Sequence, residues 1–282
     1  MSQKYLSRDG LGAGILNGLL LLVVLIILLP VVYIVLTSLK RTADIYTGAI
    51  FFTPTLNNYR EIFSGSRSNF ADLTRNSLIV SSVVAIICGV IGSLGAYGLS
   101  RLRWSKWVTG GVLVWLLFVN MMPPIVFVTP YYMWARSVGI YDSPLAVIMA
   151  HVVLNMPLAV IMMINFFAEV PQEMEEAAAI DGCNQFQAFW KVIVPMVRPG
   201  LAAMAVLVFV FSWKEFLFAL TLTTTSAGRT IPVGIANFVQ EFNIRYGDMA
   251  AGSFFAMIPA LILVLVAQRH IIKGLTVGAV KG

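Results

Sequence analysis

Charged residues are scarce in this sequence of 282 residues. Asp, Glu, Lys and Arg make up 11% of it and hydrophobic residues 59%, whereas soluble domains are about 25% charged. A water-soluble protein of this length could not hide so much apolar surface in one core. The composition therefore excludes an ordinary soluble domain and predicts that a lipid bilayer surrounds most of the chain.

Other absences narrow the function further. The sequence has no basic run of five or more residues, so we do not expect nucleic-acid binding. Its net charge of +6 fits contact with anionic lipid headgroups, but we interpret it simply as positive flanks on membrane helices. Cys88 and Cys183 form neither a metal-ligand pair nor a disulfide framework, and we expect both to be small packing residues. No small-residue cleavage site follows the first apolar segment, so we do not expect a cleavable signal peptide.

Long charge-free runs mark the membrane spans. A helix needs about 20 apolar residues to cross the hydrocarbon core, and only helices or closed barrels can cross it. The runs are too long and too uniformly apolar for barrel strands, which alternate. The sequence therefore predicts an all-α polytopic membrane protein, one domain over residues 1–282, with six transmembrane helices at about 15–37, 76–99, 108–128, 143–167, 199–222 and 250–268.

The direction of the spans follows from charge. An even number of spans places both termini on one side of the membrane. The segment 101–106 holds three positive charges, which predicts a cytoplasmic location by the positive-inside rule. The loop 171–195 and the tail 269–282 would then be cytoplasmic too. Lys and Arg are divided too evenly between the two sides for this bias alone to fix the direction.

Small residues and prolines punctuate the predicted spans. Gly92 and Ala96 have the spacing that lets helices pack closely in lipid, and we interpret them as packing within the bundle. Pro123-Pro124 and Pro157 free backbone carbonyls, so we expect kinks there, with a place beside a solute path as the alternative.

The loop 171–195 is a polar, acidic island between two apolar spans. Its glutamates would lie near the positive end of a first short helix, and Gly182 would end that helix in a left-handed conformation. A second helix would begin at Asn184, where Gln187 completes a capping-box pattern, and would end at Pro195. One apolar face is expected on this second helix, formed by Phe186, Phe189, Trp190 and Ile193.

Two neighbours would suit such a hairpin. An amphipathic connector on the membrane surface is usually basic on its polar face. The acidic start of this segment favours a protein surface instead.

The hairpin carries a motif that resembles the coupling loop of ABC importer permeases. The motif is Glu-Ala-Ala, three residues, Gly, nine residues, then two aliphatic residues one apart and Pro. It is filled by Glu176, Ala177, Ala178, Gly182, Val192, Val194 and Pro195, with valines in place of the commoner Ile and Leu. Other segments look like the carbohydrate branch, similar to the maltose-type inner-membrane permeases: Pro54 to Tyr59, Asn76-Ser77, Ala96-Tyr97 with Arg101, Trp213 to Phe216, and Gly274 to Gly282.

The resemblance implies a permease subunit without covalent chemistry of its own, in the bacterial cytoplasmic (inner) membrane. In that family two permease subunits, which we expect here to be a heterodimer, form the pathway. Two ATPase subunits bind ATP and Mg²⁺, and an extracytoplasmic solute-binding protein delivers the solute. This chain has no Gly-x-x-x-x-Gly-Lys-Ser/Thr loop, so the ATPase would be a separate chain and no cofactor or metal is expected on this one. ATP would favour one of two global states of the spans.

Site residues follow from the same resemblance. ATPase coupling is assigned to Glu176, Ala177, Ala178, Gly182 and Pro195, where small alanines permit close approach and Gly182 permits a sharp turn. The tail 269–282 would insert between the ATPases or stay free.

Lys214 and Glu215 are the only charged residues within a predicted span. A lysine at the membrane centre costs about 2.5–3.5 kcal/mol, so Lys214 should face a water-filled cavity or a partner. The family commonly has Asn at this position. Lys214 would contact an acidic, sulfonated or polyhydroxy sugar, or form an ion pair; pairing with Glu215 is awkward because adjacent helical residues do not face each other. The candidate solute pathway is Lys214, Glu215, Trp213, Asn155 and Asn120, with Phe211 and Phe216 as further stacking candidates.

The rival function is an ion-coupled six-helix secondary transporter. It would need intramembrane acids or a sodium site in broken helices, and Glu215 alone is available. A membrane-embedded hydrolase has little support, because His151 has no recognisable nucleophile or metal-ligand partner in the sequence, and we interpret it as a satisfied packing residue.

Overall fold

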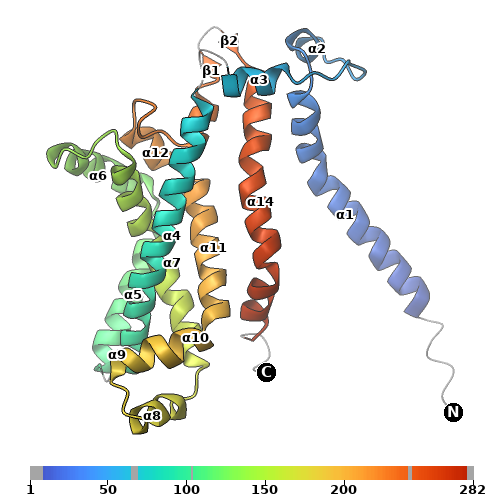
Figure 1. Cartoon of the computed structure of the whole chain (residues 1–282). Helices are drawn as coiled ribbons and strands as arrows, with labels where there is room; N and C mark the ends of the chain where they lie inside the picture. The colour runs from blue at the N-terminus through green and yellow to red at the C-terminus, as the bar shows by residue number, and fades with distance from the viewer. Residues whose placement is uncertain (1–8, 65–68, 103, 241–242, 278–282) are drawn as a thin grey trace, which may run out of the picture. The chain divides into compact units, whose positions relative to one another are not determined.

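The structure is a computed structural model in which residues 9–64, 69–102, 104–240 and 243–277 are described. Helices dominate it (Figure 1). In chain order the elements are α1 (Asp9–Ser38), α2 (Thr42–Tyr46), α3 (Asn57–Ser64), α4 (Phe70–Arg101), α5 (Lys106–Met121), α6 (Ile125–Ser137), α7 (Pro144–Ala168), α8 (Glu173–Ile180), α9 (Gln185–Ala188), the π-helix η1 (Phe189–Ile193), α10 (Val194–Met196), α11 (Arg198–Trp213), α12 (Leu217–Leu222), α13 (Ile231–Ala236), β1 (Val239–Gln240), β2 (Asn243–Ile244) and α14 (Tyr246–Val277).

Four of these helices are long and apolar enough to cross a membrane: Gly14–Ser38, Phe70–Arg101, Pro144–Ala168 and Tyr246–Val266. Two bent pairs pass the same test only together, namely Lys106–Met121 with Ile125–Ser137 and Gln185–Met196 with Arg198–Trp213. The count reaches six when each bent pair is one span. The prediction of an all-α polytopic membrane protein is therefore confirmed; the strands are one two-residue antiparallel pair.

The predicted third span, 108–128, is not one straight helix. α5 ends at Met121 and α6 leaves it at an angle of 95°. Met122 directly precedes Pro123-Pro124 and has an extended backbone. The cause is Pro123, because a residue before proline is disfavoured in the helical region. The break is thus sharper than the kink that the sequence predicts.

Two other predicted boundaries differ from the structure. The predicted fifth span, 199–222, holds α11 and α12 separated by a turn at Lys214. α14 continues to Val277, past the predicted end of the sixth span at 268, so residues 269–277 are helical rather than a separate tail. Residues 278–282 lie outside the described residues.

Contacts divide the chain into two compact units. Unit 1 comprises Met1–Ser68 with Ile235–Met257, and unit 2 comprises Asn69–Gly234 with Ile258–Gly282. In unit 1 the Asn58 amide joins the end of α1 to α3 by donating to the Ser38 and Lys40 carbonyls, at 2.7 and 2.9 Å. The Tyr59 hydroxyl lies 2.8 Å from that of Ser38. The Pro54 to Tyr59 segment thus has a local structural role.

The core of unit 2 is the packing of α4, α7 and α11 against one another. Close approach depends on small side chains: a Cβ atom at Gly92 of α4 would lie 3.0 Å from the Cβ of Ala159 on α7. Ala96, one turn further along α4, is fully buried. The small-residue spacing therefore serves packing within the bundle.

Hydrogen bonds to Asp142 connect two loops at the α6 and α12 end of unit 2. Asp142 has a positive φ of 58°, and its carboxylate accepts from the Thr224 and Thr225 backbone N–H groups at 2.7 and 2.9 Å and from the Thr225 hydroxyl at 2.8 Å. Partial burial alone would raise the pKa of Asp142. The Thr225 and Thr224 hydrogen bonds and the charge of Arg229 outweigh that effect and hold this pKa below its ordinary value.

Candidate functional site

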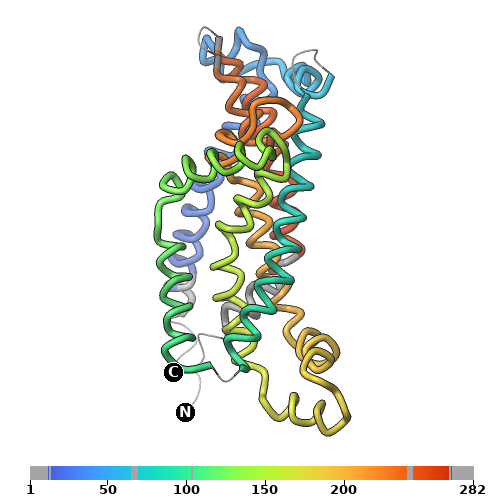
Figure 2. Tube along the Cα trace, turned by 90° about the vertical axis from the view of Figure 1, so that its left-hand side faces the viewer, coloured from blue at the N-terminus to red at the C-terminus, as the bar shows by residue number. Residues whose placement is uncertain are grey.

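The segment 171–195 forms the predicted hairpin, which projects beyond the ends of α4 and α7 (Figure 2). Gly182 follows α8 with φ of +84°, and its N–H donates to the Ala179 carbonyl at 3.0 Å. In α9 the Asn184 side chain accepts from the Gln187 N–H at 2.8 Å, and the Gln187 side chain accepts from the Asn184 N–H at 3.1 Å. The left-handed glycine and the capping box are both as predicted.

The second helix of the hairpin does not end at Pro195. It passes through the π-helix η1 into α10, which contains Pro195, and bends by 79° into α11. In η1 the Val194 N–H donates to the Phe189 carbonyl, five residues back. Proline clashes with the carbonyl four residues before it, and the π-turn, which shifts the preceding bonds by one residue, removes that conflict.

The apolar residues expected on one face of this helix differ in burial. Phe189 and Ile193 are buried, whereas Phe186 is 66% and Trp190 41% exposed. On a regular helix these residues would share one stripe. Phe189 and Ile193 thus belong to the buried side of this stripe, and Phe186 and Trp190, with ring centroids 6.2 Å apart, to its exposed side.

The exposed end of the hairpin combines acidic and apolar side chains. Glu176, Ala177 and Gly182 are exposed, and Ile180 is 87% exposed. Ala178 is only 5% exposed, because it lies on the side of α8 that packs on α9 and η1. Its small size thus permits close packing inside the hairpin, and only Ala177 of the alanine pair is accessible.

The base of the hairpin is fixed to α4 by Arg101. Its Nε lies 2.7 Å from Oε1 of Glu175, and its Nη2 donates to the carbonyls of Phe167, at 2.9 Å, and Val170. The hydroxyl of Tyr97, one turn earlier on α4, donates to Oε2 of the same glutamate at 3.1 Å. Arg101 thus joins three successive segments: the end of α4, the end of α7 and the start of α8.

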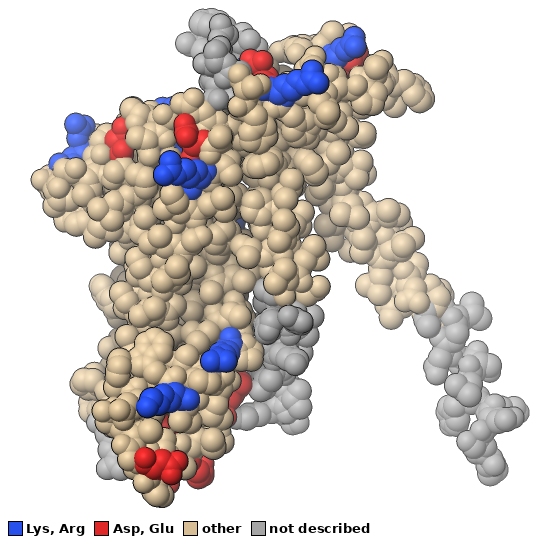
Figure 3. All heavy atoms as spheres, viewed as in Figure 1, with Lys and Arg blue, Asp and Glu red and all other residues tan. Residues whose placement is uncertain are grey.

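Aromatic rings reinforce the same junction. The Tyr97 ring centroid lies 5.7 Å from that of Phe167 and 4.8 Å from that of Phe189. Phe167 and Phe189 are both buried. Aromatic pairs at such distances add to the free energy gained from burial alone, so the hairpin has a rigid base and an exposed tip. In Figure 3 charged side chains on the visible face of unit 2 gather around this hairpin and at the opposite, α6–α12 end.

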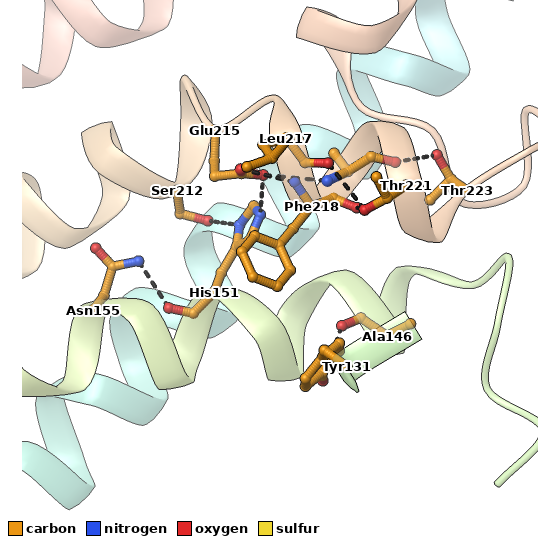
Figure 4. A network of polar contacts seen from close by, with 11 residues as sticks. Tyr131, Ala146, His151, Asn155, Ser212, Glu215, Leu217, Phe218, Thr221 and Thr223 are labelled. Atoms are coloured by element: carbon orange, nitrogen blue, oxygen red, sulfur yellow. Dashed lines mark hydrogen bonds and ion pairs between the residues drawn. The ribbon is translucent and has the colours of Figure 1, made fainter. Parts of the chain in front are cut away.

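A second polar site lies at the break between α11 and α12 (Figure 4). α11 ends at Trp213 and α12 begins at Leu217. The carboxylate of Glu215 accepts from the N–H groups of Phe218 and Ala219, at 2.9 and 3.2 Å. It thereby satisfies backbone donors that the start of a helix leaves unpaired.

His151 completes this site from α7. Its Nε2 lies 2.8 Å from Oε2 of Glu215 and its Nδ1 2.8 Å from the Ser212 hydroxyl. An ionised carboxylate only accepts, so Nε2 carries a proton. Asn155, one turn along α7, donates to the His151 carbonyl at 2.8 Å. His151 is satisfied, as predicted, but through an ionisable partner that the sequence analysis did not identify.

The other candidate pathway residues are divided between the interior and the surface. Lys214 is exposed, with its Nζ 4.7 Å from the ring centroid of Phe211; it does not pair with Glu215, as expected for adjacent residues. Trp213 is 4% exposed and stacks on Phe209, and Asn155 is 7% exposed, so both face the interior of unit 2. The rings accessible beside Lys214 are Phe211, 39% exposed, and Phe216, 40% exposed. Asn120 is exposed on α5 and takes no part in the His151 network.

Several functional side chains were missed from the sequence. Arg101 appeared only as one of the positive charges that predict the direction and as part of the resemblance, and Ile180 was not singled out. A charged residue at the end of a span, opposite an acidic loop, was the available signal for Arg101. The His151–Glu215 contact joins residues 64 positions apart, and no local pattern indicates it. Among the described residues no group of three or more His, Cys, Asp or Glu could hold a metal ion.

Comparison with known proteins decides the family. Residues 63–277 match the family described as the binding-protein-dependent transport system inner membrane component. The chain belongs to this family. It is a permease subunit of an ABC importer in the inner membrane, and the ATPase is a separate chain. The family membership gives no support to the ion-coupled alternative.

Relatives agree with this assignment, and a solved structure shares the fold. The chain is 40% identical to the trehalose transport system permease protein SugB of Mycobacterium tuberculosis (strain CDC 1551 / Oshkosh), over 90% of this chain and 93% of the relative. It is 33% identical to the sulfoquinovosyl glycerol transport system permease protein SmoH of Agrobacterium fabrum (strain C58 / ATCC 33970), over 90% and 89%. Its fold is similar to that of a chain of a bacterial ABC transporter involved in the import of the acidic polysaccharide alginate. The TM-score is 0.78 at 22% identity, over 95% of this chain and 99% of the other.

Proposed function

We propose that this permease subunit moves a sugar or sugar derivative by alternating access and is driven through the hairpin 171–195 by a separate ATPase. The observation that carries the proposal is the hairpin's construction. Arg101 and the Tyr97–Phe167–Phe189 cluster fix its base, whereas its tip exposes Ile180 and acidic side chains. A rigid base with an exposed tip suits a lever that transmits force.

The composition of the tip supports a protein rather than lipid as its neighbour. A surface helix that binds anionic lipid presents Lys and Arg, but α8 carries Glu173, Glu175 and Glu176 in its first turn and no basic residue in its last turn. Ile180, 87% exposed near these carboxylates, adds an apolar side chain that a protein partner could bury. The accessible docking residues are Glu176, Ala177, Ile180 and Gly182; Pro195 acts on the bend before α11.

The assembly in this proposal has two permease subunits, as a heterodimer, two ATPase subunits that bind ATP and Mg²⁺, and an extracytoplasmic solute-binding protein. The hairpin and both termini lie in the cytoplasm. The positive charges at Arg101 and Lys106 support this direction, and so does the need for the hairpin to meet a nucleotide-binding partner.

The solute proposal rests on the break at Lys214. Broken helices within a membrane commonly line binding sites. Here the break exposes a cation that lies over the ring of Phe211, and Phe216 at the same break is also exposed. Aromatic faces stack on sugars and a cation pairs with acidic groups. Trehalose and sulfoquinovosyl glycerol, the solutes in the two relatives' names, are both sugar compounds, which supports a sugar, neutral or anionic.

The docking proposal is tested by Gly182→Asp in the assembled transporter. A Cβ atom at Gly182 would meet no atom within 4 Å in this subunit, but the aspartate adds bulk and charge where the ATPase would bind. We expect solute uptake to be lost while ATP hydrolysis by the complex continues without solute-dependent stimulation. Gly139→Asp is the matched control, since Gly139 also has a positive φ of 76° and open space around it. Normal uptake by Gly182→Asp would refute the docking assignment.

A further inference from the structure

Within the fifth span the chain leaves the helix at Lys214 and resumes it at Leu217. In a continuous helix the N–H groups of Phe218 and Ala219 would donate to carbonyls four residues back. Here they donate to the Glu215 carboxylate, at 2.9 and 3.2 Å. The carboxylate therefore replaces helical bonds, and its presence at this place stabilises the break over the unbroken helix.

The Glu215 carboxylate is itself held from outside its own helix. His151, whose side chain is fully buried on α7, donates from Nε2 at 2.8 Å, and the His151 ring is fixed at Nδ1 by the Ser212 hydroxyl at 2.8 Å. Glu215 is only 15% exposed. An ionisable residue at membrane depth is costly unless it is paired. The contact with His151 therefore lowers the cost of placing Glu215 there, in addition to its part in packing.

The break decides where the Lys214 side chain lies. On an unbroken helix Lys214 would share a face with Phe211 and with Phe218, three residues before and four after. Phe218 is 2% exposed, whereas Phe211 is 39% exposed. The turn lets Phe218 remain in the core while Lys214 stays with the exposed ring of Phe211, with its Nζ 4.7 Å from the ring centroid.

We propose that His151 and Glu215 are positioning residues: together they keep the fifth span broken and thereby hold the Lys214 side chain on the accessible side of the break. The inference rests on the proposed function for the role of Lys214 in solute contact. The part of the inference that concerns the break rests on the contacts of Glu215 alone. His151 and Glu215 act on Lys214 through the backbone turn between α11 and α12, so their effect on transport is indirect.

The test is the labelling rate of Lys214→Cys in the assembled transporter, by a membrane-impermeant, charged thiol reagent. Cys183→Ser removes the partly exposed native thiol, while Cys88 is fully buried. We expect His151→Ala to lower the labelling rate about tenfold, the scale set by losing one hydrogen bond to a charged group. His151→Gln, whose amide can still donate to Glu215, should restore most of the rate.

The control is Ser137→Cys, an exposed position at the end of α6, whose labelling should not respond to His151→Ala. An unchanged labelling rate of Lys214→Cys in an assembled His151→Ala variant would overturn the proposal, as would a fall that His151→Gln shares in full. If His151→Ala does not assemble, Glu215→Gln takes its place. The single amide oxygen cannot accept from His151 and from both backbone N–H groups, so the labelling rate of Lys214→Cys should again fall. An unchanged labelling rate would overturn the proposal.

The result is separable from the proposed function. Labelling of Lys214→Cys requires no transport, and Gly182→Asp should leave it unchanged while abolishing uptake. A failed positioning role would therefore leave the docking result standing. A failed docking assignment would likewise leave the labelling result standing.

Discussion

Arg101 on α4 and Glu175 on α8 form an ion pair at the base of the hairpin, with Nε and Oε1 2.7 Å apart and side chains only 9% and 22% exposed. The same guanidinium donates to two carbonyls at the end of α7. One side chain thus connects two spans with the proposed lever, so in the proposed function force applied to α8 would act on both α4 and α7.

Replacing Arg101 should loosen the lever. Removing one partner of a buried ion pair costs about 3–5 kcal/mol, and we expect Arg101→Ala to fall toward the lower end because Glu175 is partly exposed. The thermal unfolding midpoint of the purified complex should drop, and the ratio of solute imported to ATP hydrolysed should fall severalfold.

Lys106→Ala is the matched control for Arg101→Ala. Lys106 is an exposed cation at the start of α5, so its removal tests the loss of positive charge alone. A full import-to-hydrolysis ratio in Arg101→Ala would contradict the role of this contact in coupling.

Enlarging Gly92 should force α4 and α7 apart. Since even a Cβ there would lie 3.0 Å from the Cβ of Ala159, Gly92→Leu overpacks the contact and should destabilise the subunit by about 1–3 kcal/mol. The fraction of the purified subunit that stays folded in detergent measures this effect. Gly110→Leu should be tolerated, because no atom lies within 4 Å of a Cβ at Gly110; equal losses for both variants would contradict the prediction.

Lys214→Asn should change solute discrimination. If the cation contacts an acidic group, its loss should lower uptake of a uronate- or sulfonate-bearing sugar about tenfold, the scale of one charge-assisted hydrogen bond. Uptake of neutral disaccharides should change much less, and Lys214→Arg should retain the preference. Uptake assays with paired neutral and anionic sugars decide the matter, and identical ratios in wild type and Lys214→Asn would remove Lys214 from solute recognition.

Asp142 should stabilise the α6–α12 end in a pH-dependent manner. Its pKa is lowered in the folded protein by the Thr225 and Thr224 hydrogen bonds and the charge of Arg229, against the opposing effect of burial. A carboxyl with a lowered folded-state pKa contributes stability above its unfolded pKa of about 3.9, and that contribution disappears as the pH falls through the folded value.

The variant Asp142→Asn isolates the charge, because Asn tolerates the positive φ of 58° at this position. We expect a lower unfolding midpoint than wild type between pH 6 and 7, and convergence of the two proteins as the pH falls below about 4. A difference in midpoint that persists unchanged at the lowest pH would contradict an electrostatic cause.

Local chemistry was predictable from the sequence. The left-handed Gly182, the capping box of Asn184 and Gln187, and the break near Pro123-Pro124 each follow from the conformational limits of a few adjacent residues. Their counterparts in the structure have the expected dihedral angles and hydrogen bonds. The six long apolar runs were equally clear, because the cost of exposing polar backbone to lipid leaves few alternatives.

Tertiary partners were not predictable. Ala178 and Ala177 look alike in the sequence, and only the packing of α8 on η1 makes one buried and the other accessible. Trp213 seemed as good a stacking candidate as Phe211, but the end of α11 turns it onto Phe209. Burial thus depends on how each helix ends and packs, which the residue types alone do not indicate.

The π-turn at η1 adds one residue within the hairpin, between α9 and α11. Each residue of a helix corresponds to about 100° of rotation, so this single insertion sets the angular phase between the docking tip and the fifth span. A one-residue deletion between Phe186 and Pro195 would leave the composition of the loop intact, yet would swing the aromatic pair Phe186 and Trp190 by roughly a quarter-turn. Length, as much as residue identity, is therefore under constraint in this segment, and permeases that exchange ATPases should differ here by substitution rather than by gaps.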